Sequence, residues 1–447
     1  MPVMAANMHG MQPHADDGDY PRRPYAWVVV GILIATAVLS YTDRQVLSLL
    51  VDPIRRDLGI SDTQISLLLG TAFAVVYGVA GIPLGYLADR ASRRNLIFAG
   101  VVVWSLGTLA CGLSRSFGQL FAARIIVGLG EAVLSPAAIS LISDYFPPAR
   151  RGMAVGCFLS GIAMGIGASI LIGGGVLHIV QLGALAGTPF ASEAPWRLVL
   201  LVIGAPGLLW ALAILLIREP LRRVNVPADK SVPGSGISAG RSTSWARAVP
   251  IYLVVAAASL VDNAVGAWAP TLLIREFGKN PAQVGIRLGL LLTAGFGGGV
   301  LIGGWLADHF GARHGWTGKL GVCLCSGIAI LPVSMLINAR DYSVVLLAVP
   351  LYFGLSGIVT ACGFSAILDA VPNRSRGLAM SVSFFLNVAL GAGLGPTAVA
   401  LASDHVFGTA GALGPALTLT MAAGYLVAIV ALVAALSVFR GRQIMVH

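Results

Sequence analysis

Long apolar stretches separated by short polar breaks run through the whole chain. About 20 helical residues are needed to cross roughly 30 Å of hydrocarbon, and we count twelve stretches of about that length. They are residues 26–50, 64–88, 95–114, 117–142, 153–180, 197–217, 249–274, 284–307, 319–338, 342–368, 377–402 and 411–439. The pattern predicts an all-α membrane protein with twelve transmembrane helices.

The composition and the charge distribution agree with a membrane protein. Hydrophobic residues make up 57% of the chain and charged residues only 11%, whereas soluble domains carry about 25% charged residues. The formal charge of +10 could suggest nucleic-acid binding. With both termini placed in the cytoplasm, however, 19 of the 29 Lys and Arg fall in inside segments and eight in outside loops. This is the positive-inside pattern, so we expect a bacterial inner-membrane protein and no nucleic-acid partner.

Several classes of site are not expected from the sequence. Residues 1–24 lack the apolar core of a cleaved signal peptide. The five cysteines all lie in apolar stretches without a C-x-x-C spacing, which favours neither disulfides nor a zinc site. The glycine runs follow no strand and contain no G-x-x-x-x-G-K-[ST] motif. We therefore expect no metal, no cofactor and no enzymatic activity.

The chain contains an internal repeat. An offset of 219 residues aligns Ser40 with Ser259, Asp43 with Asp262, Arg56 to Gly59 with Arg275 to Gly278, and Gly85 with Gly304. An offset of 225 aligns Asp144, Pro147, Arg151 and Gly152 with Asp369, Pro372, Arg376 and Gly377. Two six-helix halves of the same design are predicted.

The repeat predicts how the chain is divided. We expect a tail at 1–24, bundles at 25–217 and 248–440, a Pro-, Gly- and Ser-rich cytoplasmic linker at 218–247, and a tail at 441–447. Because each half has an even number of helices, the halves are parallel and related by an axis along the membrane normal. In such proteins the substrate site lies between the halves, and transport works by rocking one half against the other.

A motif between the second and third stretches occurs twice. The sequences GYLADRASRR (85–94) and GWLADHFGAR (304–313) resemble the conserved cytoplasmic motif of the major facilitator superfamily. The resemblance implies that Asp89 caps a helix that starts near Gly377 and helps to latch the cytoplasmic side in the outward-facing state. A carboxylate at a helix N-terminus is favoured by the helix dipole. The alternative is that the charged residues anchor basic loops at the lipid head groups.

The predicted cytoplasmic gate contains residues from both motif copies and from the 225-residue repeat. Its members are Asp89, Arg93, Arg94, Asp144, Arg151, Asp308, Arg313, Asp369 and Arg376.

Ionisable residues inside a span are costly unless they face a cavity or a partner, so each one is a functional candidate. Helix one holds Asp43 and Arg44, helix four holds Arg124 and Glu131, and helix seven holds Asp262. At about 1.5 Å per residue, Asp43 and Arg124 lie about 12 and 10 Å below the outer surface, with Glu131 two turns deeper. The alternatives are a fixed ion-pair lock between helices, or an Arg44 side chain that reaches the outer head groups.

Three segments of the first half resemble the Spinster-type branch of the superfamily, whose animal members carry lysolipids and sphingosine-1-phosphate. They are YTDR (41–44), RIIVGLGEAVLSP (124–136) and SDYFPPARRGMAVG (143–156). Organic-anion symporters share similar Y-x-D-R and G-E-A sequences. The resemblance implies proton coupling at Asp43 and Glu131, and head-group recognition by Arg44 and Arg124.

The second half is predicted to contribute mainly apolar surface, with Asp262 and Asn263 as further substrate-binding residues. We therefore expect a monomeric, proton-coupled transporter that moves an amphiphilic or anionic molecule by alternating access. The alternative is a small organic-anion/proton symporter or a drug-type efflux facilitator.

Overall fold

The first half folds as six membrane spans. The computed structural model describes residues 20–88, 90–184, 187, 192–220, 222, 245–371, 376–408 and 412–444. The helices of this half are α1 (Arg23–Gln45), α2 (Val51–Leu58), α3 (Asp62–Ser66), α4 (Ala72–Ala88), α5 (Arg93–Leu113), α6 (Phe117–Glu131), α7 (Leu134–Tyr145), α8 (Pro148–Gln181) and α9 (Pro195–Ile214). A π-helical turn, Leu67–Thr71, joins α3 to α4 within the second span, and α6 and α7 together form the fourth.

The second half contains the other six spans. Its helices are α10 (Trp245–Phe277), α11 (Pro281–Leu336), α12 (Tyr342–Ala370), α13 (Arg376–Leu386), α14 (Gly393–Leu401) and α15 (Leu413–Ile444). Within the described residues, nine helices are long and apolar enough to cross a membrane, and the 56-residue α11 contains two predicted spans. The remaining spans are α8 and the pair α13 and α14, which a π-helical turn connects. The twelve-helix prediction is confirmed.

The repeat is visible in the backbone at the ends of corresponding helices. Gly59 follows α2 with a φ of 63°, and Gly278 follows α10 with a φ of 60°. Both residues occupy the left-handed region, which glycine adopts without a steric penalty and which commonly ends a helix. Ser61 and Gln64 then form a capping box that starts α3. The aligned glycines of the sequence therefore end their helices in the same way.

The two copies of the repeated motif fold differently. In the first copy α4 ends at Ala88, and Ser92 caps α5 by accepting a hydrogen bond from the Asn95 N–H. The second copy, 304–313, is helical throughout, although its last six residues were expected to lie between two helices. The chain turns at Gly315, whose φ of 59° and ψ of −144° interrupt the helical geometry. The turn therefore lies between the predicted spans 284–307 and 319–338, but beyond the motif.

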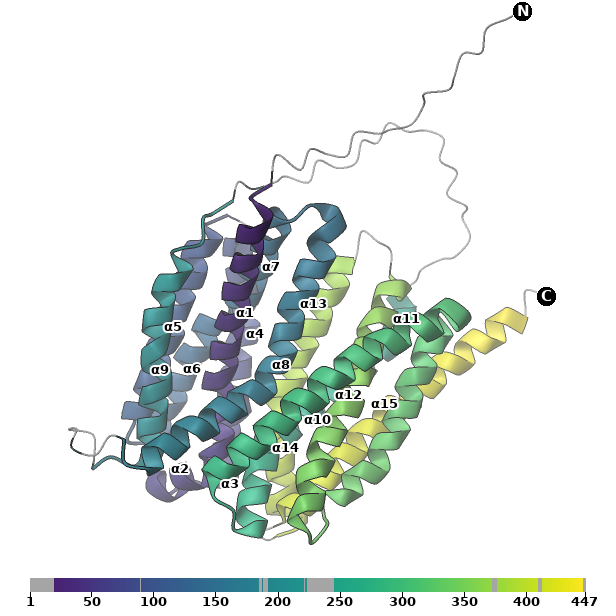
Figure 1. Cartoon of the computed structure of the whole chain (residues 1–447). Helices are drawn as coiled ribbons and strands as arrows, with labels where there is room; N and C mark the ends of the chain where they lie inside the picture. Colours follow the sequence, from purple (N-terminus) through teal and green to yellow (C-terminus); the bar gives the residue numbers. More distant parts are fainter. Residues whose placement is uncertain are drawn as a thin grey trace, which may run out of the picture.

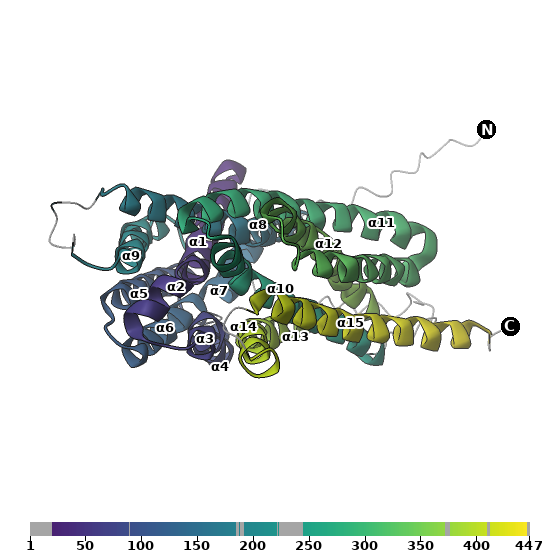
Figure 2. The same ribbon diagram turned by 90° about the horizontal axis from the view of Figure 1, so that it is seen from below.

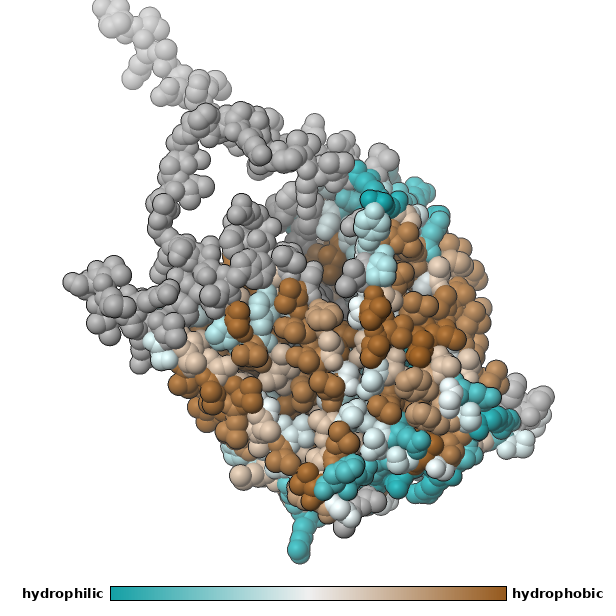
Figure 3. Space-filling model, turned by 180° about the vertical axis from the view of Figure 1, so that it is seen from behind, coloured by the Kyte–Doolittle hydropathy of each residue, from teal (hydrophilic) through white to brown (hydrophobic). Residues whose placement is uncertain are grey.

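The two halves are arranged side by side, with α1, α5, α6 and α9 in one group and α11, α12 and α15 in the other (Figure 2). We call the end that holds the starts of α1, α5 and α8 the inner end, and the opposite end, near α2 and α3, the outer end. In Figure 1, α8 and α11 cross toward the outer end and separate toward the inner end. In Figure 3, hydrophobic side chains cover the middle of the visible face, and hydrophilic ones gather above and below them.

Candidate functional site

An ion pair inside the membrane region joins the first and fourth spans. Arg44 Nη2 donates to Glu131 Oε2 over 2.6 Å, and the two side chains are 16% and 0% exposed. The Arg44 guanidinium also lies 4.0 Å from the centre of the Phe73 ring and 4.7 Å from that of Tyr41. Aromatic faces attract a cation in this arrangement. The guanidinium is therefore held by a buried carboxylate and aromatic rings.

A second acid and arginine lie close together in the same half without an ion pair. Arg124 Nε donates to the Leu68 carbonyl over 3.1 Å, and Nη1 donates to the backbone carbonyl of Asp43 over 3.5 Å. Among the described residues, Arg124 Nη2 and Asp43 Oδ1 are buried and have no hydrogen-bond partner. Buried polar atoms are rarely left in this condition. An acceptor on a ligand would satisfy Arg124 Nη2, and a proton or a donor on a ligand would satisfy Asp43 Oδ1.

The four charged side chains balance one another electrically. Two are acids, Asp43 and Glu131, and two are arginines, Arg44 and Arg124. With both acids ionised the group is neutral, and each proton taken up leaves one positive charge uncompensated. The protonated cluster can therefore bind an anion to balance its positive charge. The fully ionised cluster is already neutral and needs no anion for charge balance.

The geometry agrees with the depths calculated from the sequence. Arg124 reaches the backbone of Asp43, as expected for two residues at a similar level. Arg44 turns toward the fourth span and binds Glu131. An ion pair between helices was one of the alternatives predicted for this residue. Among the described residues, no group of three or more His, Cys, Asp or Glu side chains could hold a metal ion.

The two candidates of the second half make their contacts within that half. Asp262 Oδ1 accepts hydrogen bonds from the Tyr352 hydroxyl and the Ser356 hydroxyl, each over 2.6 Å. The Asn263 side chain donates to the Ser259 carbonyl over 2.8 Å. The sequence placed Asp262 and Asn263 at the substrate, but it offered no signal for these hydroxyl partners, which lie about ninety residues away.

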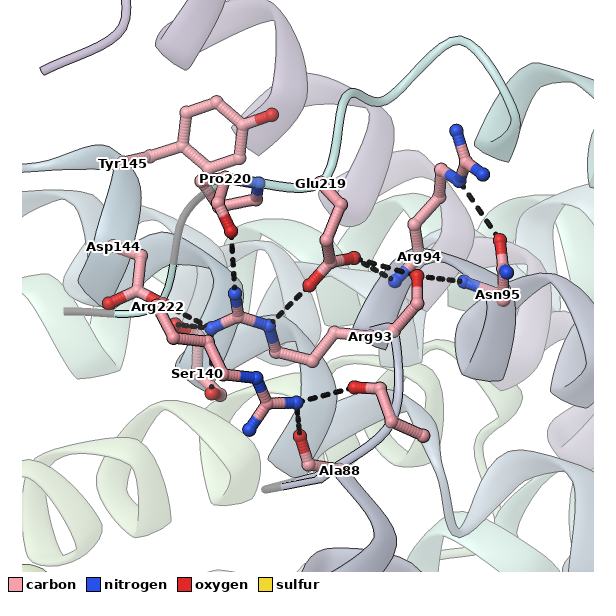
Figure 4. Close-up of polar contacts among 12 residues, drawn as sticks. Ala88, Arg93, Arg94, Asn95, Ser140, Asp144, Tyr145, Glu219, Pro220 and Arg222 are labelled. Carbon is pink, nitrogen blue, oxygen red and sulfur yellow. Dashed lines mark hydrogen bonds and ion pairs between the residues drawn. The ribbon is translucent and has the colours of Figure 1, made fainter. Parts of the chain in front are cut away.

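A charged cluster at the inner end gathers three of the predicted gate residues (Figure 4). Arg93 is buried and binds both Asp144 and Glu219, its Nε lying 2.8 Å from a Glu219 oxygen. Glu219 also accepts a hydrogen bond from the backbone N–H of Arg94 over 2.9 Å and one from the Ser92 hydroxyl over 3.0 Å. The cluster ties the start of α5 to α7 and to the segment that follows α9.

Glu219 belongs to the segment that the sequence assigned to the linker, and sequence reasoning missed it. Burial raises the pKa of its carboxyl, but hydrogen bonds from the Arg94 N–H, Arg93 and Ser92 lower it by more, so the pKa lies below its usual value. Arg222 also docks here and donates to the Ala88 carbonyl over 2.9 Å. The signal that could have identified Glu219 was its position as a single acid in the basic segment REPLRR.

The other predicted gate residues are spread over the inner end. Asp369 pairs with Lys319 within the second half, and Asp308 and Arg313 are exposed on α11. Three of the predictions cannot be placed with their side chains. Asp89 lies outside the described residues, as do the side chains of Arg151 and Arg376, whose backbones belong to α8 and α13.

The outer end holds an ion-pair cluster that the sequence did not predict. Arg275, at the end of α10, binds Asp52 through Nε over 2.7 Å. Its two terminal nitrogens bind both carboxylate oxygens of Asp62 over 2.7 and 2.8 Å. Arg275 comes from the second half and both acids from the first, so the cluster joins the halves. The only signal was the position of Arg275 in the repeat, opposite Arg56.

Comparison with known proteins agrees with this architecture. The family model of the Major Facilitator Superfamily matches residues 33–396. An MFS-type efflux pump of Mycolicibacterium smegmatis is 32% identical over 93% of this chain and 92% of the pump. The protein Spinster of Drosophila melanogaster is 31% identical over 44% of this chain and 30% of that protein.

A similar solved structure is that of a bacterial homologue of the human lysosomal transporter Spinster, in an inward-facing and unoccupied conformation. It has a TM-score of 0.72 and 27% identity, with 93% of this chain and 96% of that chain covered. From the twelve spans, the repeated halves and these matches, the chain belongs to the Major Facilitator Superfamily of transporters.

Proposed function

We propose that this chain is a proton-coupled transporter that moves an organic molecule with an anionic group by alternating access. The observation that carries the proposal is the buried ion pair of Arg44 and Glu131, which joins the first and fourth spans inside the membrane region. An ion pair is costly to bury and is retained in membrane spans chiefly where it works in transport or signalling. The family supplies the transport activity, and the charged cluster supplies the coupling.

Protonation of Glu131 provides a direct route to coupling. A neutral Glu131 no longer balances Arg44, so the guanidinium gains a free charge for an anionic group of the substrate. Proton release restores the pair and displaces the anion. Binding of proton and anion together keeps the cluster electrically neutral, as a low-dielectric site requires, and this favours movement of both in the same direction.

Asp43 and Arg124 form the second part of the proposed machinery. The unpartnered Oδ1 of Asp43 can accept a proton or a donor from the substrate, and the unpartnered Nη2 of Arg124 can donate to an anionic oxygen. These atoms are buried here, so access to them requires movement of the helices around them. Arg124 already contacts the backbone at Asp43, which couples substrate binding on α6 to the position of α1.

An anionic amphiphile, such as a lysolipid or a sphingoid phosphate, suits the cluster best. The charged residues of the spans are concentrated in the first half, whereas the second half offers mainly apolar side chains for a hydrocarbon tail. The resemblance to Spinster proteins supports this class. A second candidate is a small organic anion, because a hexuronate transporter of Bacillus subtilis is 25% identical over 87% of this chain. Drug-type efflux is a third, given the similarity to an efflux pump.

Flux into proteoliposomes tests the coupling and the substrate class together. The probes are lysophosphatidic acid, sphingosine-1-phosphate, glucuronate and ethidium, each with and without an imposed pH gradient. We expect wild type to accumulate an anionic amphiphile in response to the gradient. Glu131→Gln is expected to exchange that probe across the membrane but to respond less to the gradient than wild type, because an acid that carries a coupled proton is gone.

Arginine variants separate binding from coupling. Arg44→Gln and Arg124→Gln should each weaken binding of the anionic probe by about tenfold or more, since hydrogen bonds to charged groups contribute about 1.5–3 kcal/mol. Arg115→Gln, an exposed arginine at the outer end, is the matched control and should bind as wild type does. Gradient-driven flux as large as that of wild type in both Glu131→Gln and Asp43→Asn would show that these two acids do not couple transport.

A further inference from the structure

The second half retains the acid of the first helix but not the arginines that accompany it in the first half. The offset of 219 places Asn263 beside Asp262 at the position of Arg44. The offset of 225 places Val349 at the position of Arg124. Neither position supplies a cation to Asp262, so the two halves hold their acids in different electrostatic surroundings.

Hydroxyl groups take the place of the missing arginines. Tyr352 and Ser356 of α12 both donate to Asp262 Oδ1 over 2.6 Å, and the Tyr425 hydroxyl of α15 donates to the Ser356 hydroxyl over 3.0 Å. One carboxyl oxygen therefore anchors a chain of hydroxyls that runs across α10, α12 and α15. All these contacts lie within the second half, away from the first-half cluster.

The surroundings of Asp262 leave its second oxygen for a proton. Within the described part of the chain, Asp262 Oδ2 accepts no hydrogen bond, and the residue is partly exposed. The titratable groups that face it are the phenols Tyr352 and Tyr425, with the Cys323 thiol of α11 beyond Tyr425, and none of them is a cation. Neutral hydroxyls stabilise a carboxylate but leave its net charge in the membrane, where an uncompensated charge is expensive.

We infer that Asp262 binds a second proton of the transport cycle on Oδ2, while the hydroxyls of Tyr352 and Ser356 hold Oδ1. This inference rests on the proposed proton coupling and extends it to the second half. Proton binding makes the acid neutral without disturbing the two bonds that tie α10 to α12. Proton release leaves a negative charge on Asp262 that no arginine of the second half balances.

Infrared spectroscopy of the reconstituted protein tests proton binding without any substrate. We expect wild type to show, in a pH titration, the carbonyl band of a protonated carboxylic acid that Asp262→Asn lacks. Tyr352→Phe keeps the acid and removes one donor, so it should retain the band at a shifted frequency. Glu193→Gln changes a partly exposed acid at the outer end that Arg115 keeps ionised near neutral pH, so it should match wild type except in acid, where Glu193 itself is protonated. An Asp262→Asn spectrum identical to wild type at every pH would overturn the inference.

Coupling stoichiometry then separates this inference from the proposed function. The number of protons moved per substrate is obtained by finding the substrate gradient that just balances an imposed pH gradient, with the anionic probe that wild type transports. We expect Asp262→Asn and Glu131→Gln each to move one proton fewer than wild type, because each variant lacks one of the acids that carry a proton. An unchanged ratio in Asp262→Asn overturns the second site and leaves the proposed function standing. Wild-type flux that ignores the gradient overturns the proposed function, and the infrared band alone then decides whether Asp262 binds a proton.

Discussion

The outer and inner ends of the molecule connect the two halves in opposite ways. At the outer end, polar contacts cross between the halves; they are Arg275 with Asp52 and Asp62, Thr63 with Asp404, and Asn280 with Gln181. At the inner end, the ion pairs of the described residues join helices of one half; they are Arg93 with Asp144 and Glu219, and Lys319 with Asp369. The outer side is thus closed by bonds that outward opening must break.

The difference changes how the predicted cytoplasmic gate is understood. In this conformation Arg93 and Asp144 brace the first half, and Asp369 binds within the second. A latch between the halves, as the family resemblance implies for the outward-facing state, stays a prediction for that other conformation. The likeness to an inward-facing solved structure agrees with an outer side that is closed.

Removal of Arg275 should have the largest effect on this asymmetry. Arg275→Gln removes both short bonds to Asp62, whose side chain is 2% exposed, and leaves this buried carboxylate only a longer contact of 3.6 Å with Arg55, which costs up to about 3 kcal/mol. Outward opening gives that carboxylate water, so we expect a shift of up to roughly a hundredfold toward the outward-open state. Spin labels at Gly118 and Arg340, both exposed at the outer end, should report a longer distance.

The internal repeat offers a matched control for Arg275. Arg56 occupies the equivalent position in the first half. It lines a hollow at the outer end together with Arg275, but it is exposed. Arg56→Gln should leave the spin-label distance unchanged. Both variants are best made in a background in which the exposed Cys157 and Cys325 are replaced by serine, so that only the chosen positions are labelled. Equal distances in the two variants would mean that the outer ion pairs do not hold the halves together.

Adding a single methyl group at the contact between the halves should have the next largest effect on outward opening. A Cβ at Gly289 of α11 would lie 2.4 Å from the backbone nitrogen of Leu171 on α8, which is too close unless the helices separate. Overpacking of this kind costs about 1–3 kcal/mol. Gly289→Ala should therefore favour outward opening in the same spin-label measurement. Gly298→Ala, on the same helix with nothing within 4 Å of its Cβ, is the control and should behave as wild type.

Loss of one hydrogen bond between the halves should have a smaller effect. The Thr63 hydroxyl donates to Asp404 over 2.7 Å, and Asp404 is partly exposed, so water can replace this donor. Thr63→Val should weaken outer closure by about 1 kcal/mol, seen as a modest broadening of the distance distribution. Thr317→Val removes a hydroxyl at the inner end whose hydrogen bond, among the described residues, goes to the His314 carbonyl. A response from Thr317→Val as large as that from Thr63→Val would contradict the assignment of closure to the outer contacts.

The features that were predictable from the sequence are local or periodic. Apolar stretches gave the twelve spans, the repeat offset paired Gly59 with Gly278, and intramembrane charge singled out Arg44 and Glu131. Each of these depends on residues close in the chain or on the cost of charge in lipid. The Spinster-type resemblance, based on first-half motifs, is confirmed by the structural match across most of the chain.

The contacts that escaped the sequence depend on which conformation the halves adopt or on distant partners. Arg275 meets Asp62 only when the outer ends come together, and no spacing in the chain encodes that state. Tyr352 and Ser356 look like ordinary core residues until folding brings them to Asp262. Glu219 looked like part of a flexible linker, because its bonds to the start of α5 span more than a hundred residues.

Glu219 gives the smallest expected effect and tests the inner end of the comparison. Glu219→Gln removes the carboxylate that binds Arg93, in a cluster formed by the first half and the segment that follows α9. We therefore expect a slightly lower melting temperature at neutral pH and an unchanged spin-label distance at the outer end. A lengthened distance would show that the inner cluster helps to set the conformation and is more than a brace.

The pH dependence of this variant identifies the carboxylate as the source of the effect. Because the folded pKa of Glu219 lies below its usual value of 4.5, the ionised group stabilises the fold above about pH 4.5. That stability is lost as the pH falls through the lower folded pKa. The difference in melting temperature between wild type and Glu219→Gln should thus be full near neutral pH and vanish in acid. Glu193→Gln serves as the control: Arg115 holds the pKa of this exposed acid below its usual value too, but solvent screens the pair, so its difference should be smaller at every pH. If the difference in melting temperature between wild type and Glu219→Gln persists undiminished in acid, the effect comes from lost packing. The charge of Glu219 would then not contribute to the stability of the cluster.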